Sequence, residues 1–333
     1  GYDMNFQHKT FFKVFGAILS FVLISGSVAF TFLNWRGILD FIAAKNYKPT
    51  SEITQIVQRI KPTDTGKTIF YASNPQVEDS AEFNGNCKSS EGDSAVLGCY
   101  RAEKIHVYNV VNTKLDGIKD VTAAHELLHA IWQRMSRDER IKIGNLLEAE
   151  YEKNKTPEFE KLMQSYEKTE PGEKINELHS LIGTEYANIS KELESHYAKF
   201  FQNRKEIVQI YQGYDNNLKN LKNQAEKLSN ELKAEKEQIE ALNAKYSDDI
   251  KKINSDIANF NSNAKSGYYE TQQAFNADRA KLLARIQQIE VWRTAINNLV
   301  NNYNSKVEEL NQVSIQQNEL YKSMNSNLSS PSL

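Results

Sequence analysis

The sequence predicts an α+β globular domain that follows one N-terminal transmembrane helix and precedes a long antiparallel α-helical coiled-coil hairpin. Three observations lead to this fold class. A charge-free apolar run occupies 14–33, and β-prone segments within 67–111 are followed by amphipathic helical patterns. From about residue 206 to 322, apolar residues then recur at helical spacing in a polar background.

These patterns divide the chain of 333 residues into six segments. They are a cytoplasmic N-terminus at 1–13, a transmembrane anchor at 14–35, a stalk at 36–66, the globular domain at 67–203, the coiled-coil hairpin at 204–322 and a disordered tail at 323–333. A formal net charge of -2 argues against a nucleic-acid partner. The mean hydropathy of -0.62 indicates a long solvated section beside the core.

The apolar run at 14–33 is long enough to cross the hydrocarbon layer of a bilayer. Lys9 and Lys13 precede it and favour an N-terminus that stays inside. We therefore expect a single-pass cell-membrane protein whose bulk is extracytoplasmic. The alternative is a cleaved signal peptide, because the small-x-small sequence ending at Ala29 has the form of a cleavage site, and the protein would then be secreted.

The first part of the globular domain is expected to form strands. Apolar residues at helical spacing in 53–60 predict an amphipathic piece of the stalk, which the Pro- and Gly-containing segment 61–66 ends. After this break, 68–72 is β-prone, 84–86 has the composition of a turn and 105–111 alternates as a strand.

Cys87 and Cys99 bracket a loop rich in Ser, Gly and Asp. Two isolated cysteines in an exported chain are expected to bond to each other, which closes a short loop and contributes roughly 3 kcal/mol through chain entropy. A zinc site at this pair is not expected, because the sequence has no C-x-x-C spacing and no third cysteine.

The segment 120–130 combines two imidazoles and one carboxylate in a helical context. Residues i and i+4 of a helix share a face, so His125 and His129 point the same way and are able to hold one metal ion. Glu126 lies beside them without being placed to ligate the ion. Such an ion activates a water and polarises a carbonyl, while a carboxylate takes the proton and passes it to the leaving amine. This chemistry is peptide hydrolysis.

The flanks of this segment predict a buried helix. Its apolar stripe consists of Val121, Ala124, Leu127, Leu128 and Ile131. Asp120 or Thr122 is expected to cap the start of the helix.

A catalytic zinc needs a third protein ligand and an open fourth position. The segment 176–186, about fifty residues downstream, supplies three candidates, which are Glu177, His179 and Glu185. His179 would give a three-histidine site, whereas Glu185 follows the helix-breaking Gly183. A candidate that does not bind the metal is expected to orient an imidazole instead.

The His125-Glu126-x-x-His129 sequence resembles the HExxH signature of the zincin metallopeptidases. The sequence Asn176-Glu177-x-x-Ser180 is similar to the second-helix motif of the gluzincins, in which a Glu is the third ligand. This resemblance implies a zincin-like α+β catalytic domain over 67–203 and one zinc ion per chain. It makes His125, His129 and Glu177 the ligands and Glu126 the general base. Leu181 stands where the family often has an acidic residue.

The resemblance also bears on the strand at 105–111 and on the residues after the third ligand. Zincin domains carry an edge strand that the substrate joins by β-pairing, so this strand is either that edge strand or an ordinary core strand. Tyr186, His196 and Tyr197 are the candidates for stabilising the oxyanion, and packing on an amphipathic helix is the alternative for each.

The apolar stripe of 204–322 predicts a coiled coil that 261–267 interrupts. Two arms of similar length favour an antiparallel hairpin, with a continuous coil in a dimer as the alternative.

The leading hypothesis is a membrane-anchored, outward-facing zinc metallopeptidase that acts on a peptide or protein, with the coiled coil binding a partner or a second copy. The alternative is a cell-envelope scaffold whose zincin-like domain is structural or degenerate. A metallohydrolase that cleaves another amide, such as a cell-wall crosslink, is a third possibility.

Overall fold

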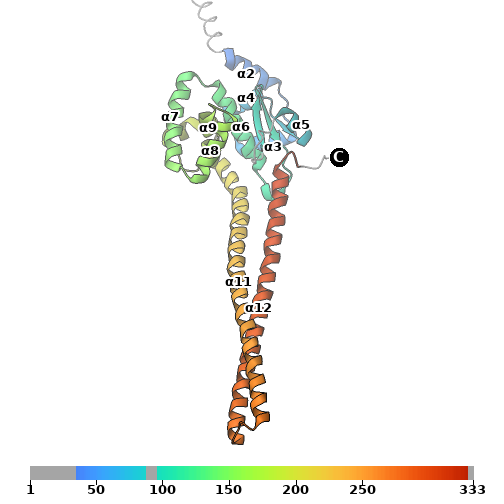
Figure 1. Cartoon of the computed structure of the whole chain (residues 1–333). Coiled ribbons are helices and arrows are strands. Elements are labelled where there is room, and N and C mark those ends of the chain that lie inside the picture. Colours follow the sequence, from blue (N-terminus) through green and yellow to red (C-terminus); the bar gives the residue numbers. More distant parts are fainter. Residues whose placement is uncertain (1–34, 88–95, 329–333) are drawn as a thin grey trace, which may run out of the picture. The chain divides into compact units, whose positions relative to one another are not determined.

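The computed structural model describes residues 35–87 and 96–328 of the chain (Figure 1). Helical residues make up 78% of the described part, and its strands form one three-stranded sheet. The expected zincin-like α+β domain is therefore wrong, because helices dominate where strands were expected. The chain divides into two compact units. Unit 1 runs to Asn216 and resumes at Leu320, and unit 2 is Asn217–Glu319.

In the described residues, no helix has both the length and the apolar character needed to cross a membrane. This finding overturns the predicted single-pass placement in the cell membrane. The predicted anchor at 14–35 and the alternative cleavage site at Ala29 lie outside the described residues, except for Trp35. Trp35 begins helix α2 (Trp35–Asn46), which packs on α4 (Asp64–Ala72).

Two segments expected to be β-prone or turn-forming are helices, because side chains cap their first turns. Helix α4 follows Thr63, whose hydroxyl accepts a hydrogen bond from a backbone N–H of the first turn. Helix α5 (Ser80–Asn86) follows Asp79, whose carboxylate accepts two such bonds. Each cap satisfies N–H groups that an isolated helix end leaves unpaired.

The segment 36–66 is part of unit 1 and does not form a stalk. Its second helix, α3 (Ser51–Ile60), buries Ile53, Ile56 and Ile60 completely or almost completely. This apolar face packs against helix α6 (Ile118–Arg134), the helix that carries the HExxH sequence. The helical spacing of these residues was therefore correct, whereas the inference that they stand apart from the globular part was wrong.

The sheet has the strand order β1-β3-β2. Strand β3 (Lys104–Tyr108) is central, since it pairs in parallel with β1 (Gln76–Glu78) and antiparallel with β2 (Gly98–Arg101). The strand expected at 105–111 is thus a core strand, and β2 is an edge of the sheet. Cys87 and Cys99 form the predicted disulfide, which joins the end of α5 to β2.

The remaining helices of unit 1 follow α6 in the chain. They are α7 (Arg137–Asn154), α8 (Pro157–Thr169), α9 (Lys174–Glu185) and α10 (Lys191–Tyr197), and a 3-10 turn at Thr113–Leu115 precedes α6. Helix α9 packs directly on α6, and both α7 and α8 pack on α9 (Figure 1). The predicted apolar stripe of α6 is buried along its whole length. This packing fixes the helix that carries the histidines against α9.

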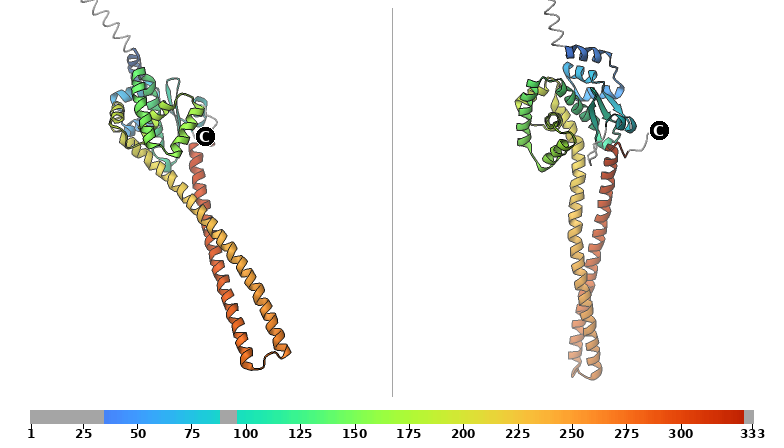
Figure 2. Two further views of the ribbon diagram at one scale, coloured as in Figure 1. Left: turned by 60° about the vertical axis from the view of Figure 1, so that its left-hand side comes forward. Right: turned by 45° about the horizontal axis from the view of Figure 1, so that its top comes forward.

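Unit 2 consists of parts of two long helices, α11 (Arg204–Ser266) and α12 (Gln272–Met324), which run antiparallel (Figure 2). Lys306 on α12 reaches Glu231 on α11 at 2.8 Å, and Phe260 packs on Phe275 with ring centroids 5.0 Å apart.

The chain returns to unit 1 at Leu320. The predicted disordered tail at 323–333 is wrong as far as residue 328, because Ser326 is buried and hydrogen-bonded to Asn84.

Candidate metal centre

Helix α6 begins at Gly117 and not at a polar capping side chain. Gly117 has φ 90°, a left-handed conformation that favours glycine, and a Cβ atom there would lie 2.2 Å from the Ile210 side chain. Neither predicted cap is used. The Asp120 carboxylate lies 3.1 Å from the Arg59 guanidinium, and the Thr122 hydroxyl donates to a carbonyl one turn earlier.

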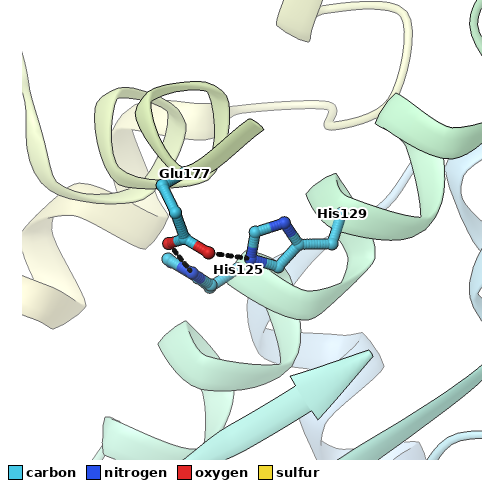
Figure 3. A group of neighbouring side chains, drawn as sticks. All are labelled: His125, His129 and Glu177. Carbon is cyan, nitrogen blue, oxygen red and sulfur yellow. Dashed lines mark ion pairs between the residues drawn. The ribbon is translucent and has the colours of Figure 1, made fainter. Parts of the chain in front are cut away.

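The side chains of His125, His129 and Glu177 converge between α6 and α9 (Figure 3). His125 Nε2 lies 3.6 Å from Glu177 Oε2, and His129 Nε2 lies 3.4 Å from Glu177 Oε1. One ligand atom from each of the three residues lies within 4.8 Å of the other two. The structure thus brings two segments about fifty residues apart to one point, as the third-ligand argument required.

These separations fit a metal ion. With ligand bonds of about 2.1 Å, two donors of a tetrahedral ion lie roughly 3.4 Å apart. The Glu177 Oε2 atom is buried and has no hydrogen-bond partner in the described part of the chain. A buried carboxylate oxygen without a donor is costly, and a cation between the three side chains would remove that cost. Two histidines and one carboxylate are also a donor set that zinc prefers.

The charge of Glu177 follows from the same neighbours. Burial acts to favour its protonated form, but His125 and His129 together hold the pKa of this carboxyl below its usual range. Glu177 therefore carries its negative charge at neutral pH, as a metal ligand must.

The orientation of His129 is set by two hydrogen bonds in series. The carboxylate of Glu173 is an acceptor, so the Asn176 amide nitrogen, 2.9 Å away, donates to it. This fixes the Asn176 carbonyl oxygen toward His129 Nδ1, at 2.9 Å, and makes that nitrogen the donor. The lone pair of His129 Nε2 consequently faces Glu177. Sequence reasoning missed Asn176 and Glu173 as site residues, although Asn176 belongs to the quoted motif.

Glu126 is buried beside strand β2. A Cβ atom on Gly98 would lie 2.7 Å from Glu126 Oε1, so only glycine lets the strand pass this close to the carboxylate. Burial raises the pKa of Glu126 to about 8, and the charges of Glu177 and Glu170 act in the same direction while His129 opposes them.

The two rival ligands are engaged elsewhere. His179 is fully buried, and its Nε2 atom lies 2.8 Å from His196 Nε2. Burial holds the pKa of His179 well below its usual value, so this imidazole is neutral. Glu185 lies two turns beyond Glu177 on α9 and is hydrogen-bonded to Tyr211. Neither belongs to the converging group.

The three residues considered for the oxyanion are also occupied in packing. Tyr186 stacks on Phe159 with ring centroids 5.2 Å apart, and the Tyr197 hydroxyl donates to the carbonyl oxygen of His179 at 2.7 Å. His196 forms the imidazole pair with His179. These contacts agree with the packing alternative for each residue.

A phenol that the sequence did not single out lies near the centre. Burial raises the pKa of Tyr166 far above its usual value, and the carboxylates of Glu177 and Glu126 add to this effect. Tyr166 lies in helix α8. No feature of the sequence distinguished it from an ordinary buried aromatic residue.

Comparisons with protein-family models, with curated proteins and with solved structures find no match to this chain. The functional argument therefore depends on the side chains described above and on their geometry.

Proposed function

We propose that the protein is a zinc-dependent peptide hydrolase with a gluzincin-type ligand set. His125, His129 and Glu177 would hold one ion. The observation that carries this proposal is their convergence with separations of 3.4 and 3.6 Å, beside a buried general base at Glu126. The proposal concerns the site alone, because the surrounding unit is mainly helical.

A zinc ion held by these three residues would lower the pKa of a bound water and polarise a substrate carbonyl. Glu126 supplies the proton transfers. Its carboxylate would accept a proton from the attacking water and return it to the departing amine. Asn176 keeps His129 in the tautomer that a ligand needs.

The test separates metal binding from hydrolysis. The purified chain is expected to bind one zinc ion, measured by metal analysis after dialysis, and to cleave short peptides. Glu126→Gln keeps the shape of the side chain but not its basicity, so it should retain the ion and lose turnover. Glu152→Gln, on the exposed face of α7, is the matched control and should retain both. A wild-type chain without stoichiometric zinc would refute the proposal.

A second proposal concerns unit 2, whose paired helices leave large apolar residues exposed. Leu283 is 47% exposed and Val291 is 61% exposed. Such a rod suits docking to a protein partner or to a second copy, and in that scaffold role the metal centre would be structural. The two proposals differ in one measurement, since a structural centre binds zinc without any peptide turnover.

A further inference from the structure

A cavity of about 480 Å³ lies directly beside the metal centre within unit 1. His129 and Asn176 belong to both, so the cavity is within reach of the group next to a scissile bond held at the metal centre. The other walls come from β2, the end of α6, the start of α7 and the start of α9. The occupant of the cavity therefore influences which peptides are cleaved.

Two charged residues of the lining are already bonded. The Arg140 guanidinium donates to the backbone oxygens of Trp132 and Gln133, at 2.9 and 2.7 Å. The carboxylate of Glu173 accepts the amide N–H of Asn176 at 2.9 Å. These bonds hold both charged groups at the wall and satisfy part of their hydrogen-bonding capacity.

The polar groups contributed by β2 and the turn after it are bonded as well. The hydroxyl of Tyr100 accepts a hydrogen bond from Arg134 at 3.0 Å. Glu103 forms an ion pair with Arg36 at 2.7 Å. A charged substrate group would have to compete with these existing partners, whereas an apolar group would not.

Beside these polar groups and Gln133, the lining has an aromatic and apolar part. Trp132, Tyr100 and Ile175 are half-buried and line the cavity. The Trp132 ring is held from behind by His179, with ring centroids 5.3 Å apart. A fixed aromatic wall favours an aromatic occupant, because ring pairs gain more than their buried area alone, and the fixed Arg140 charge adds attraction for a ring face.

We propose that this cavity binds the aromatic side chain of the residue next to the scissile bond, with Trp132 as its main wall. The inference rests on the proposed peptide hydrolysis and adds the class of substrate: peptides with Phe, Tyr or Trp at that position. Trp132 thereby determines specificity, and it does so without touching the reacting atoms.

The first experiment needs no metal and uses the full chain. N-acetyl-phenylalanine amide and N-acetyl-alanine amide are titrated separately, and the indole N–H signals are followed by NMR. The loss of one signal in Trp132→Leu assigns the Trp132 resonance among those of the three tryptophans. The phenylalanine compound is expected to shift this signal and the alanine compound is not. If neither compound shifts it, the inference is refuted.

The second experiment uses the zinc-loaded chain and short hydroxamic acids that differ only in a benzyl, isobutyl, methyl, aminobutyl or carboxymethyl side chain. Calorimetry should show the benzyl compound binding at least about ten-fold more tightly than the methyl compound, as burial of an aromatic ring predicts. Trp132→Leu should reduce this ratio, because it removes the main aromatic contact of the benzyl ring. Ile175→Ala provides a second, smaller change of the wall, and Ile141→Ala, which is 54% exposed on α7, is the control.

The outcomes separate the two proposals. Bound zinc without a benzyl preference, or with a preference that survives Trp132→Leu and Ile175→Ala, overturns the specificity inference and leaves the hydrolase proposal standing. A preference for the aminobutyl or carboxymethyl compound also overturns it, since the cavity would then select charge. Failure to bind zinc overturns the hydrolase proposal and with it the substrate assignment, while the metal-free titration still decides whether the cavity holds an aromatic ring.

Discussion

The tautomer of His129 depends on one amide side chain. Asn176 accepts from His129 Nδ1 and donates to Glu173, so its two ends have opposite roles and cannot exchange without losing both bonds. Asn176→Leu is expected to weaken zinc binding about 10- to 100-fold, as loss of an orienting partner usually does. Competition for zinc with a chromogenic chelator measures the affinity of each chain. Asn176→Asp keeps the acceptor for His129 but loses the donation to Glu173 and faces its carboxylate, so its zinc affinity should lie between those of the wild type and Asn176→Leu. Equal affinity of all three chains would contradict the role.

The buried His196 is expected to make stability depend on pH. Burial lowers the pKa of His196 from 6.5 to about 4. Between these values the unfolded chain binds a proton that the folded chain does not, so the stability contribution is present above pH 6.5 and is lost as the pH falls toward 4. Going from pH 7 to 4.5 should cost about 2 kcal/mol of unfolding free energy through this residue alone.

Urea denaturation of the wild type and of His196→Gln at both pH values measures the contribution. The variant lacks the titrating ring, so its loss of stability on acidification should be smaller by about that amount. Equal losses in the two chains would show that His196 titrates normally in the folded state.

The close approach of β2 to α6 constrains stability and, under the proposed function, the position of Glu126. A Cβ atom on Gly98 would come within 2.6 Å of the Thr122 side chain and 2.7 Å of Glu126 Oε1. Gly98→Ala is therefore expected to lower the unfolding free energy by about 1 to 3 kcal/mol, as overpacking does, and to reduce peptide turnover by moving the general base. Zinc binding should persist, because the ligands lie on other elements.

Gly85→Ala is the matched control for this change. No atom of the described residues lies within 4 Å of a Cβ atom at Gly85, which is inside helix α5. Alanine should slightly stabilise the chain there, because it is the better helix former. Chemical denaturation and peptide cleavage are measured for both variants. Turnover in Gly98→Ala equal to that of Gly85→Ala would show that β2 does not position Glu126.

The elements that the sequence predicted correctly are those whose pattern is long and one-sided. The stripe on α6 and the spacing of Ile53, Ile56 and Ile60 each bury one face of a helix, and such periodicity survives any tertiary arrangement. Helices α4 and α5 are short, and their β-prone or turn-like composition is outweighed by the caps at Thr63 and Asp79. The excess of expected strands, and hence the wrong fold class, comes from these short elements.

The residues of the candidate site also divide into those that the sequence predicted and those that it did not. His125, Glu126 and His129 were found because their chemistry requires a fixed spacing in sequence, and Glu177 was found through the resemblance of its segment to the gluzincin motif. The residues that orient or surround them, Glu173, Tyr166 and Gly98, depend on how three separate elements meet in space. A single sequence does not show which elements pack against one another. Tyr186, His196 and Tyr197 were candidates only because they are near in sequence, and the contacts described for them are packing contacts.

At the scale of the whole molecule, the proposed chemistry belongs to unit 1 alone. The three converging ligands, the general base and the cavity all come from residues before Asn216, and each unit is compact by itself. Unit 2 can therefore be shortened without touching the site. Removing 239–302 and joining the arms with a four-residue Gly-rich turn keeps the pairing of Lys306 with Glu231 and Glu235.

This shortened chain separates the hydrolase from the scaffold proposal. If unit 1 is an enzyme, zinc stoichiometry and cleavage of a short peptide should stay within about two-fold of the wild type, because no residue of the site has changed. Binding to a protein partner or self-association, measured by light scattering and by retention on the immobilised partner, should fall if unit 2 is the docking element. Loss of peptide cleavage in a chain that keeps its helical circular dichroism and its zinc would mean that the hairpin contributes to turnover.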